Sequence, residues 1–274
     1  MEIRALHEGD LDAADRVLRR AFAALLGRDE QRDTDLVRTR WSAPHVVALG
    51  AFDGPGLVGS VFVTGWGSVG FVGPLSVEPS LWGRGIGSAL FAAADGRLAG
   101  MVHRGLFTFA HSPAHHRLYQ RFGYWPRFLT ALMSSPVAPA PAGVAWSVGS
   151  AADRADLDAG AARLAGTVFP GLDVRGEIAT VLDQKIGDVL VLGPVADPTG
   201  LAVVHDGPGS EAGSGLAYVK VALVRPGAGA DFARLVDACL GHAAAIGADR
   251  LVVGVNTARH RAYRHLGERG FVTD

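Results

Sequence analysis

The sequence has one cysteine, two lysines and no excess of charge of either sign. Cys239 has no second cysteine to pair with, so the chain forms no internal disulfide and no oxidising compartment is indicated. The 26 Lys and Arg residues almost cancel the 27 Asp and Glu residues. This balance gives the protein no overall attraction to nucleic acid or to an anionic membrane, and we expect neither as a partner.

Long apolar runs are also missing. No stretch reaches the ~18 consecutive apolar residues that a membrane-spanning helix needs. The opening residues Met1–Leu6 lack the basic-then-apolar order of a signal peptide. We therefore expect a cytoplasmic protein.

What the sequence does contain is enough apolar residues for a large core. Hydrophobic residues make up 49% of the 274 residues, and the mean hydropathy is +0.22, well above the range of disordered chains. A proline- and alanine-rich stretch, Pro136–Gly143, divides the sequence nearly in half and favours an extended backbone. We predict two domains, 1–135 and 144–274, joined by a linker at 136–143.

The order of predicted elements is similar in both halves, which indicates a duplicated mixed α/β unit. In the first half the patterns predict strands at 2–6, 46–52, 57–64, 69–77, 106–110 and 128–134, and helices at 10–26, 34–41, 85–99 and 114–122. In the second half they predict strands at 144–148, 189–192, 201–205, 216–224 and 251–255, and helices at 151–167, 174–186, 230–246 and 258–267.

A glycine-rich loop between a strand and a helix is the most informative segment. The apolar run Leu75–Val77 leads to Pro79, then to glycines at 83, 85 and 87, then to a helix. Glycine lets the backbone approach a ligand closely, and the free N–H groups at a helix start attract phosphate oxygens. The pattern by itself fits a phosphate site and a flexible turn before a helix equally well.

The surrounding sequence resembles the acyl-CoA loop of the GNAT N-acetyltransferase superfamily. The superfamily motif is Gln/Arg-x-x-Gly-x-Gly/Ala, three residues after a proline that closes a strand. Pro79, Gly85 and Gly87 match that motif, while Trp82 stands where Gln or Arg is usual.

A second segment, His111–Tyr124, is similar to the later GNAT motif, a helix that carries Leu-Tyr followed by Gly-Phe/Tyr. It also resembles the bacterial acetyltransferases named for enhanced intracellular survival, which have two GNAT units and a third, sterol-carrier-like domain. The 274 residues leave no room for that third domain, and we do not expect it here.

The resemblance implies a fold, a co-substrate and a cofactor site. The fold class is α/β with two tandem GNAT-like units, each a mixed, mostly antiparallel sheet flanked by helices. The co-substrate is acetyl-CoA, whose thioester is attacked directly by an amine. The residues implied in binding it are Leu75, Ser76, Val77, Gly83, Arg84, Gly85, Ile86, Gly87, Ser88 and Ser112.

The same resemblance implies Tyr119 as the acid that protonates the departing thiolate; the competing interpretation is a core residue on a helix. A base must remove a proton from the acceptor amine. We take His111 as the first candidate and Glu78 as the second, and each also fits a structural or solvent-exposed position. His115 and His116 lie nearby, but adjacent residues point to different helix faces and no cysteine joins them, so we predict no metal site.

The second half resembles a degenerate copy. Asn256–Phe271 is similar to the tyrosine-bearing motif, with Tyr263 in the helix. The glycine positions of the loop, however, fall on Phe232 and Arg234, whose side chains would crowd a pyrophosphate. We predict that the second unit has lost cofactor binding.

The predicted function is that of an N-acetyltransferase acting on a primary amine of a small molecule or a peptide, as a monomer or a homodimer. Two alternatives stay open: a non-catalytic acyl-CoA-binding module, and an acyltransferase that uses a longer acyl-CoA.

Overall fold

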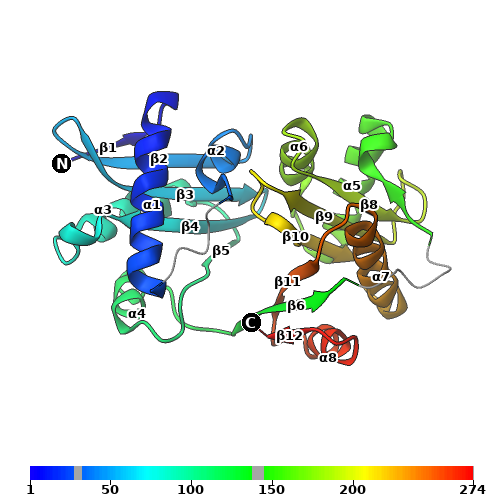
Figure 1. Ribbon diagram of the computed structural model, residues 1–274. Helices are drawn as coiled ribbons and strands as arrows, with labels where there is room; N and C mark the ends of the chain where they lie inside the picture. The colour runs from blue at the N-terminus through cyan, green and yellow to red at the C-terminus, as the bar shows by residue number, and fades with distance from the viewer. Residues whose placement is uncertain (28–32, 138–144, 274) are drawn as a thin grey trace. The chain divides into compact units, whose positions relative to one another are not determined.

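The computed structural model describes residues 1–27, 33–137 and 145–273. The chain forms two compact units, one made of residues 1–32 and 36–127 and the other of residues 33–35 and 128–274. Each unit is a sheet with helices on both faces, as Figure 1 shows, so the predicted mixed α/β class with two tandem units is confirmed.

The first unit is built on a five-stranded sheet in the order β1-β2-β3-β4-β5. The strands are β1 (Glu2–Ala5), β2 (Val46–Asp53), β3 (Gly56–Trp66), β4 (Val69–Val77) and β5 (His103–Leu106). Neighbours run antiparallel except for β4 and β5, which are parallel. Side chains alternate between the faces along each strand: Phe62 of β3 faces one core cluster, and Val61 and Val63 face the other.

Two helices cover each face of this sheet. Helices α1 (Leu11–Leu26) and α2 (Leu36–Trp41) pack on one face, and α3 (Ile86–Arg97) and α4 (Pro113–Gln120) contribute to the core on the other. The apolar positions of α1 recur every three or four residues, which gives it one buried stripe. Short 3₁₀ turns, η1 (Glu8–Asp10) and η2 (Pro79–Leu81), precede α1 and α3.

The second unit is built on a seven-stranded sheet in the order β12-β6-β11-β10-β9-β8-β7. Its strands are β6 (Thr130–Pro136), β7 (Ser147–Val148), β8 (Gly187–Leu192), β9 (Gly200–Gly207), β10 (Gly213–Val224), β11 (Arg250–Asn256) and β12 (Val272–Thr273). Among the described strands of this sheet, only β10 and β11 pair in parallel. The one parallel pair thus occupies the same place as β4 and β5 in the first sheet.

Helices again cover both faces. A short 3₁₀ turn, η3 (Gly149–Ala151), leads into α5 (Arg154–Val168), which packs with α6 (Arg175–Asp183) on one face; α7 (Gly229–Ala245) and α8 (His260–Glu268) pack on the other. Cys239 lies buried in α7, and burial raises the pKa of its thiol to about 12. A thiol held protonated among apolar side chains acts as a small core residue.

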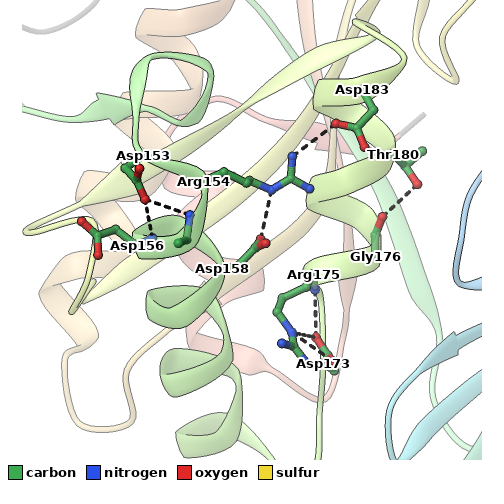
Figure 2. Close-up of polar contacts among 10 residues, drawn as sticks. Asp153, Arg154, Asp156, Asp158, Asp173, Arg175, Gly176, Thr180 and Asp183 are labelled. Atoms are coloured by element: carbon green, nitrogen blue, oxygen red, sulfur yellow. Dashed lines mark hydrogen bonds and ion pairs between the residues drawn. The ribbon is translucent and has the colours of Figure 1, made fainter.

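Polar side chains tie α5 to α6 (Figure 2). The Asp153 carboxylate caps α5 by accepting hydrogen bonds from the backbone N–H groups of Ala155 and Asp156, at 2.9 and 3.1 Å. The Arg154 guanidinium donates to Asp158 in its own helix and to Asp183 at the end of α6, both at 3.2 Å. One arginine therefore links the two helices over this face of the sheet.

Strand β6 joins the second sheet, although it follows the last helix of the first unit. It pairs antiparallel with β11 along its whole length, from Arg250↔Pro136 to Asn256↔Thr130, and with β12 on its other edge; Figure 1 shows it beside both. The division between the units falls at 127/128, before the boundary that we expected at 135, because these ladder bonds hold the strand in the second sheet. Most of the expected linker, residues 138–143, lies outside the described residues.

Within the described ranges, no helix combines the length and the apolar character that crossing a membrane requires.

The position of β6 predicts opposite behaviour for two fragments of the first half. A fragment ending at Arg127 lacks β6, whereas one ending at Val137 carries it without either ladder partner and exposes Met133, which is 3% exposed in the intact chain. Unpaired strand edges promote association. We expect the longer fragment to elute from a sizing column mainly as aggregates at concentrations where the shorter one does not. Equal elution of both fragments as monomers would contradict this.

Candidate active site

An opening forms in the first sheet where β4 and β5 separate. Their parallel ladder has four residue pairs and ends at Val72↔Leu106. Beyond it, β4 stays paired with β3 through Leu75, Ser76 and Val77, while the chain after Leu106 turns away. The strand predicted at 106–110 is therefore wrong in its extent, since β5 spans His103–Leu106.

The cause of the separation lies in two residues of β4. Gly73 and Pro74 form a bulge, because the register passes from Val63↔Val72 to Val61↔Leu75. Pro74 has no N–H group and cannot donate to a fifth strand. A backbone donor is thus missing from β4 just beyond its last pair with β5.

A cavity of about 330 Å³ occupies this opening. Its walls come from the end of β4, the glycine loop, the segment after β5 and residues of α1 and α4; Figure 1 shows these elements in the first unit. The predicted site residues that line it are Leu75, Ser76, Val77, Gly83, Gly85, Ile86, Gly87, Ser112 and Tyr119. Four others, Arg84, Ser88, Glu78 and His111, are outside the lining set.

The glycine loop presents bare backbone to the cavity. Gly83 and Gly85 have φ of +82° and +83°, in the left-handed region that favours glycine. Gly85 is the N-cap of α3, and a Cβ atom at either glycine would meet no atom within 4 Å. The first N–H groups of α3 have no intrahelical acceptor. The loop therefore offers an open, electropositive helix start to an anionic group.

Trp82 holds this loop against β4. Its indole Nε1 donates to the carbonyl oxygen of Val77 at 2.8 Å, although 49% of the residue is exposed. The residue that departs from the family motif thus has a structural contact here. The bond fixes the start of the loop relative to the strand that borders the cavity.

Tyr119 reaches the cavity from α4. Its ring packs 5.1 Å from that of Phe91, which is fully buried in α3. Burial raises the pKa of Tyr119 to about 12, and a side-chain hydrogen bond with Thr108 partly offsets that rise. The phenol therefore remains protonated at any physiological pH.

His115 also lines the cavity, one helical turn before Tyr119, with their ring centroids 6.2 Å apart. Its Nδ1 is buried and has no hydrogen-bond partner among the residues that the structure describes. Burial, followed by the charges of His116 and His111, lowers the pKa of His115. The i, i+4 spacing from Tyr119 is the signal in the sequence that could have singled it out.

The two predicted bases lie elsewhere. The Glu78 carboxylate forms an ion pair with Arg20 of α1, with 2.7 Å between Oε2 and Nη2. His111 is exposed, and its ring lies 5.9 Å from that of Phe109. Their catalytic roles remain predictions.

Sequence reasoning missed one wall of the cavity. Ala21, Phe22 and Leu25 come from the last turns of α1, and Phe107 and Phe109 from the segment after β5. The rings of Phe22 and Phe109 meet edge to face at 6.3 Å. Such apolar positions have no local motif, because any amphipathic helix carries them.

The corresponding place in the second unit is different. β10 and β11 also pair in parallel over four residues, ending at Val219↔Val253. Phe232, in the first turn of α7, packs on the core and lies 5.7 Å from the ring of His265, and Arg234 donates to Asp231 at 2.9 Å. Phe232 and Arg234 are the fourth and sixth residues of α7, whose N-cap is Ala228, whereas Gly85 is the N-cap of α3. The expected correspondence between these two residues and the loop glycines is therefore displaced by four residues.

A family model matches most of the first unit. Residues 12–124 match the model "Acetyltransferase (GNAT) family". This segment is similar to that family. A comparison with curated proteins finds no match.

Solved structures share the fold of both units. A GCN5-related N-acetyltransferase from Sphaerobacter thermophilus is 18% identical, with a TM-score of 0.64, over 100% of this chain and 92% of that chain. A tandem GNAT protein from the clavulanic acid biosynthesis pathway is 15% identical, with a TM-score of 0.59, over 99% and 95%. A GCN5-related N-acetyltransferase from Kribbella flavida is 21% identical, with a TM-score of 0.53, over 93% and 64%. At these identities the likeness shows only that the chain shares the fold of these structures.

The geometry of the loop predicts that Gly85→Glu weakens CoA binding at least about tenfold, which corresponds to ~1.4 kcal/mol. A side chain at this positive φ costs about 1–2 kcal/mol, and a carboxylate there repels phosphate. The matched control is Gly96→Glu in the same helix, at an exposed position whose Cβ meets nothing within 4 Å. Calorimetry with CoA should find the control unchanged. Equal affinities for the two variants would contradict the assignment.

Proposed function

We propose that this chain is an N-acetyltransferase that transfers the acetyl group of acetyl-CoA to a primary amine of a small molecule or a peptide. The observation that carries the proposal is a single cavity bordered by the opened edge of β4, the bare helix start at Gly85 and the phenol of Tyr119. These are the three parts that acyl transfer from a thioester requires: a donor edge, an anion site and a proton donor.

Each part has a role in the proposal. The main chain of Leu75–Val77 binds the pantetheine arm and polarises the thioester carbonyl, since a preorganised N–H donor stabilises the developing oxyanion. Gly83–Ser88, including Arg84 and Ser88, holds the pyrophosphate. Ser112, the N-cap of α4, lies at the cavity wall, where its hydroxyl contacts the bound co-substrate.

The reaction is direct attack of the amine nitrogen on the thioester carbon, which breaks the carbon–sulfur bond. Tyr119 supplies a proton to the leaving sulfur. With its pKa raised to about 12, full transfer to a thiolate of pKa about 8.5 is uphill by three to four units. The phenol therefore acts by donating a hydrogen bond that becomes a proton transfer as the carbon–sulfur bond breaks.

In this proposal the first unit is catalytic and the second is a degenerate copy that does not bind CoA. The two helix starts support that division, because α3 has Gly85 as its N-cap and α7 has Ala228.

The experiment that tests the function measures thiol release from acetyl-CoA with a panel of primary amines, and from butyryl- and hexanoyl-CoA with the same amines. Thiol release that depends on both an amine and acetyl-CoA is the expected result. If calorimetry detects CoA binding but no donor releases thiol, the chain is an acyl-CoA-binding module and not an enzyme. Thiol release from butyryl- or hexanoyl-CoA, but not from acetyl-CoA, would show that the enzyme transfers a longer acyl group.

Tyr119→Phe should lower kcat about 10²-fold or more while CoA affinity stays nearly unchanged, because it removes one proton donor and almost no volume. In the wild type, Tyr119 should give no alkaline limb between about pH 7 and pH 10, since a group of pKa about 12 is still protonated there. Initial rates measured from pH 7 to pH 10 check the pH profile and kcat. Calorimetry on the wild type and on Tyr119→Phe checks the CoA affinity. Wild-type turnover in the variant would leave Tyr119 as a core residue only.

A further inference from the structure

Of the three neighbouring histidines His111, His115 and His116, only His115 lines the cavity. Residues four apart lie on one face of a helix, so His115 and Tyr119 both project from α4 into the space where the thioester is proposed to lie. Ser112, one turn earlier, supplies the N-cap of this helix. The histidine is thus placed by a capped helix rather than by a loop.

The imidazole has a buried nitrogen available for a ligand. Buried polar atoms in proteins are nearly always hydrogen-bonded, yet Nδ1 of His115 has no partner within the described part of the chain. No carboxylate lies among the described cavity residues, and no arginine or lysine does either. An unpaired ring nitrogen on a cavity wall is suited to accept a proton from a bound group.

The surroundings keep this imidazole neutral. The titratable groups near it are His111 and His116 on either side in sequence and Tyr119 one turn on, while α1 presents only Ala21, Phe22 and Leu25 to the cavity. Burial and the two neighbouring histidines all oppose its protonation, which lowers its pKa. At neutral pH the ring is therefore in the form that can act as a base.

We propose that His115 is the general base that removes a proton from the nitrogen of the acceptor amine; this inference rests on the proposed function. The acceptor ammonium loses one proton to water and its nitrogen attacks the thioester carbon. His115 takes the second proton from that nitrogen as the carbon–sulfur bond breaks. Tyr119 gives its proton to the sulfur and recovers one from the His115 imidazolium, 6.2 Å away between ring centroids. One proton is released overall, and both residues return to their starting states.

The other two candidates lack this placement. Glu78 is held in an ion pair by Arg20, and it is outside the cavity lining. His111 is exposed to solvent and is outside the same lining. His115 alone combines a place on the wall with an unpaired nitrogen.

The test compares His115→Gln, His111→Gln and the matched control His103→Gln, an exposed residue at the start of β5, in the full chain. Glutamine keeps a similar length and polarity but does not titrate. We expect His115→Gln to lower kcat/KM about 10²-fold or more at neutral pH, with CoA affinity within about threefold of wild type by calorimetry.

The pH profile separates a base from a packing residue. The wild type should lose kcat/KM as pH falls through the lowered pKa of His115, so its acid limb lies below the usual histidine range. That limb should be missing in His115→Gln and retained in the other two variants. Added imidazole should restore part of the activity of His115→Ala.

Three results would overturn the proposal. Unchanged kcat/KM in His115→Gln removes His115 while leaving the proposed function intact. Loss of the acid limb in His111→Gln transfers the role to that residue. A wild-type chain that releases no thiol with any amine overturns the proposed function and this inference together.

Discussion

The cavity depends on the end of the ladder between β4 and β5. Four residue pairs join these strands, and Gly73 and Pro74, the second of which has no N–H group, follow the last of them on β4. β4 does not collapse into the gap, because Leu75–Val77 remain bonded to β3. On the other side, the Arg40 guanidinium donates to the Gly73 carbonyl at 2.7 Å.

The parts around the opening support one another mechanically. Trp82 ties the glycine loop to the last carbonyl of β4, so the loop and the strand edge keep one geometry. Phe91 of α3 packs against the rings of Tyr119, Phe122 and Tyr124, so the helix that starts at the loop also supports α4. Packing contacts of this kind hold the groups around the cavity in fixed positions, which catalysis requires.

Both units contain a parallel strand pair, but different residues surround that pair in each. Both sheets contain one parallel pair of four residues at the same place in the strand order. In the second sheet, β11 has β6 on its other edge, and Phe232 fills core space above the sheet. In the first sheet, β5 is the last strand and its continuation lines the cavity. The same fold therefore supports a cavity in the first unit and a packed core cluster in the second.

The sequence by itself determined the local elements and the loop. The bounds of β4 were predicted to the residue, and those of α1 to within one, because hydrophobic periodicity is a local property of neighbouring residues. The glycines at 83, 85 and 87 marked the loop, and their match to the GNAT motif, together with Pro79, favoured a phosphate site over a flexible turn. The fold class followed from the same motifs.

Only the tertiary structure decided which sheet receives β6 and which polar side chains reach the cavity. Strand pairing depends on hydrogen bonds between residues more than a hundred positions apart, such as Thr130 and Asn256, which no local pattern records. His111 and His115 look alike in the sequence, but the first lies before the helix and the second on the helix face that meets the cavity. Glu78 follows β4 directly, yet its partner Arg20 comes from α1, packed against the sheet. Exposure, pairing and pKa are set by what packs against a residue, and that is fixed only when distant segments meet.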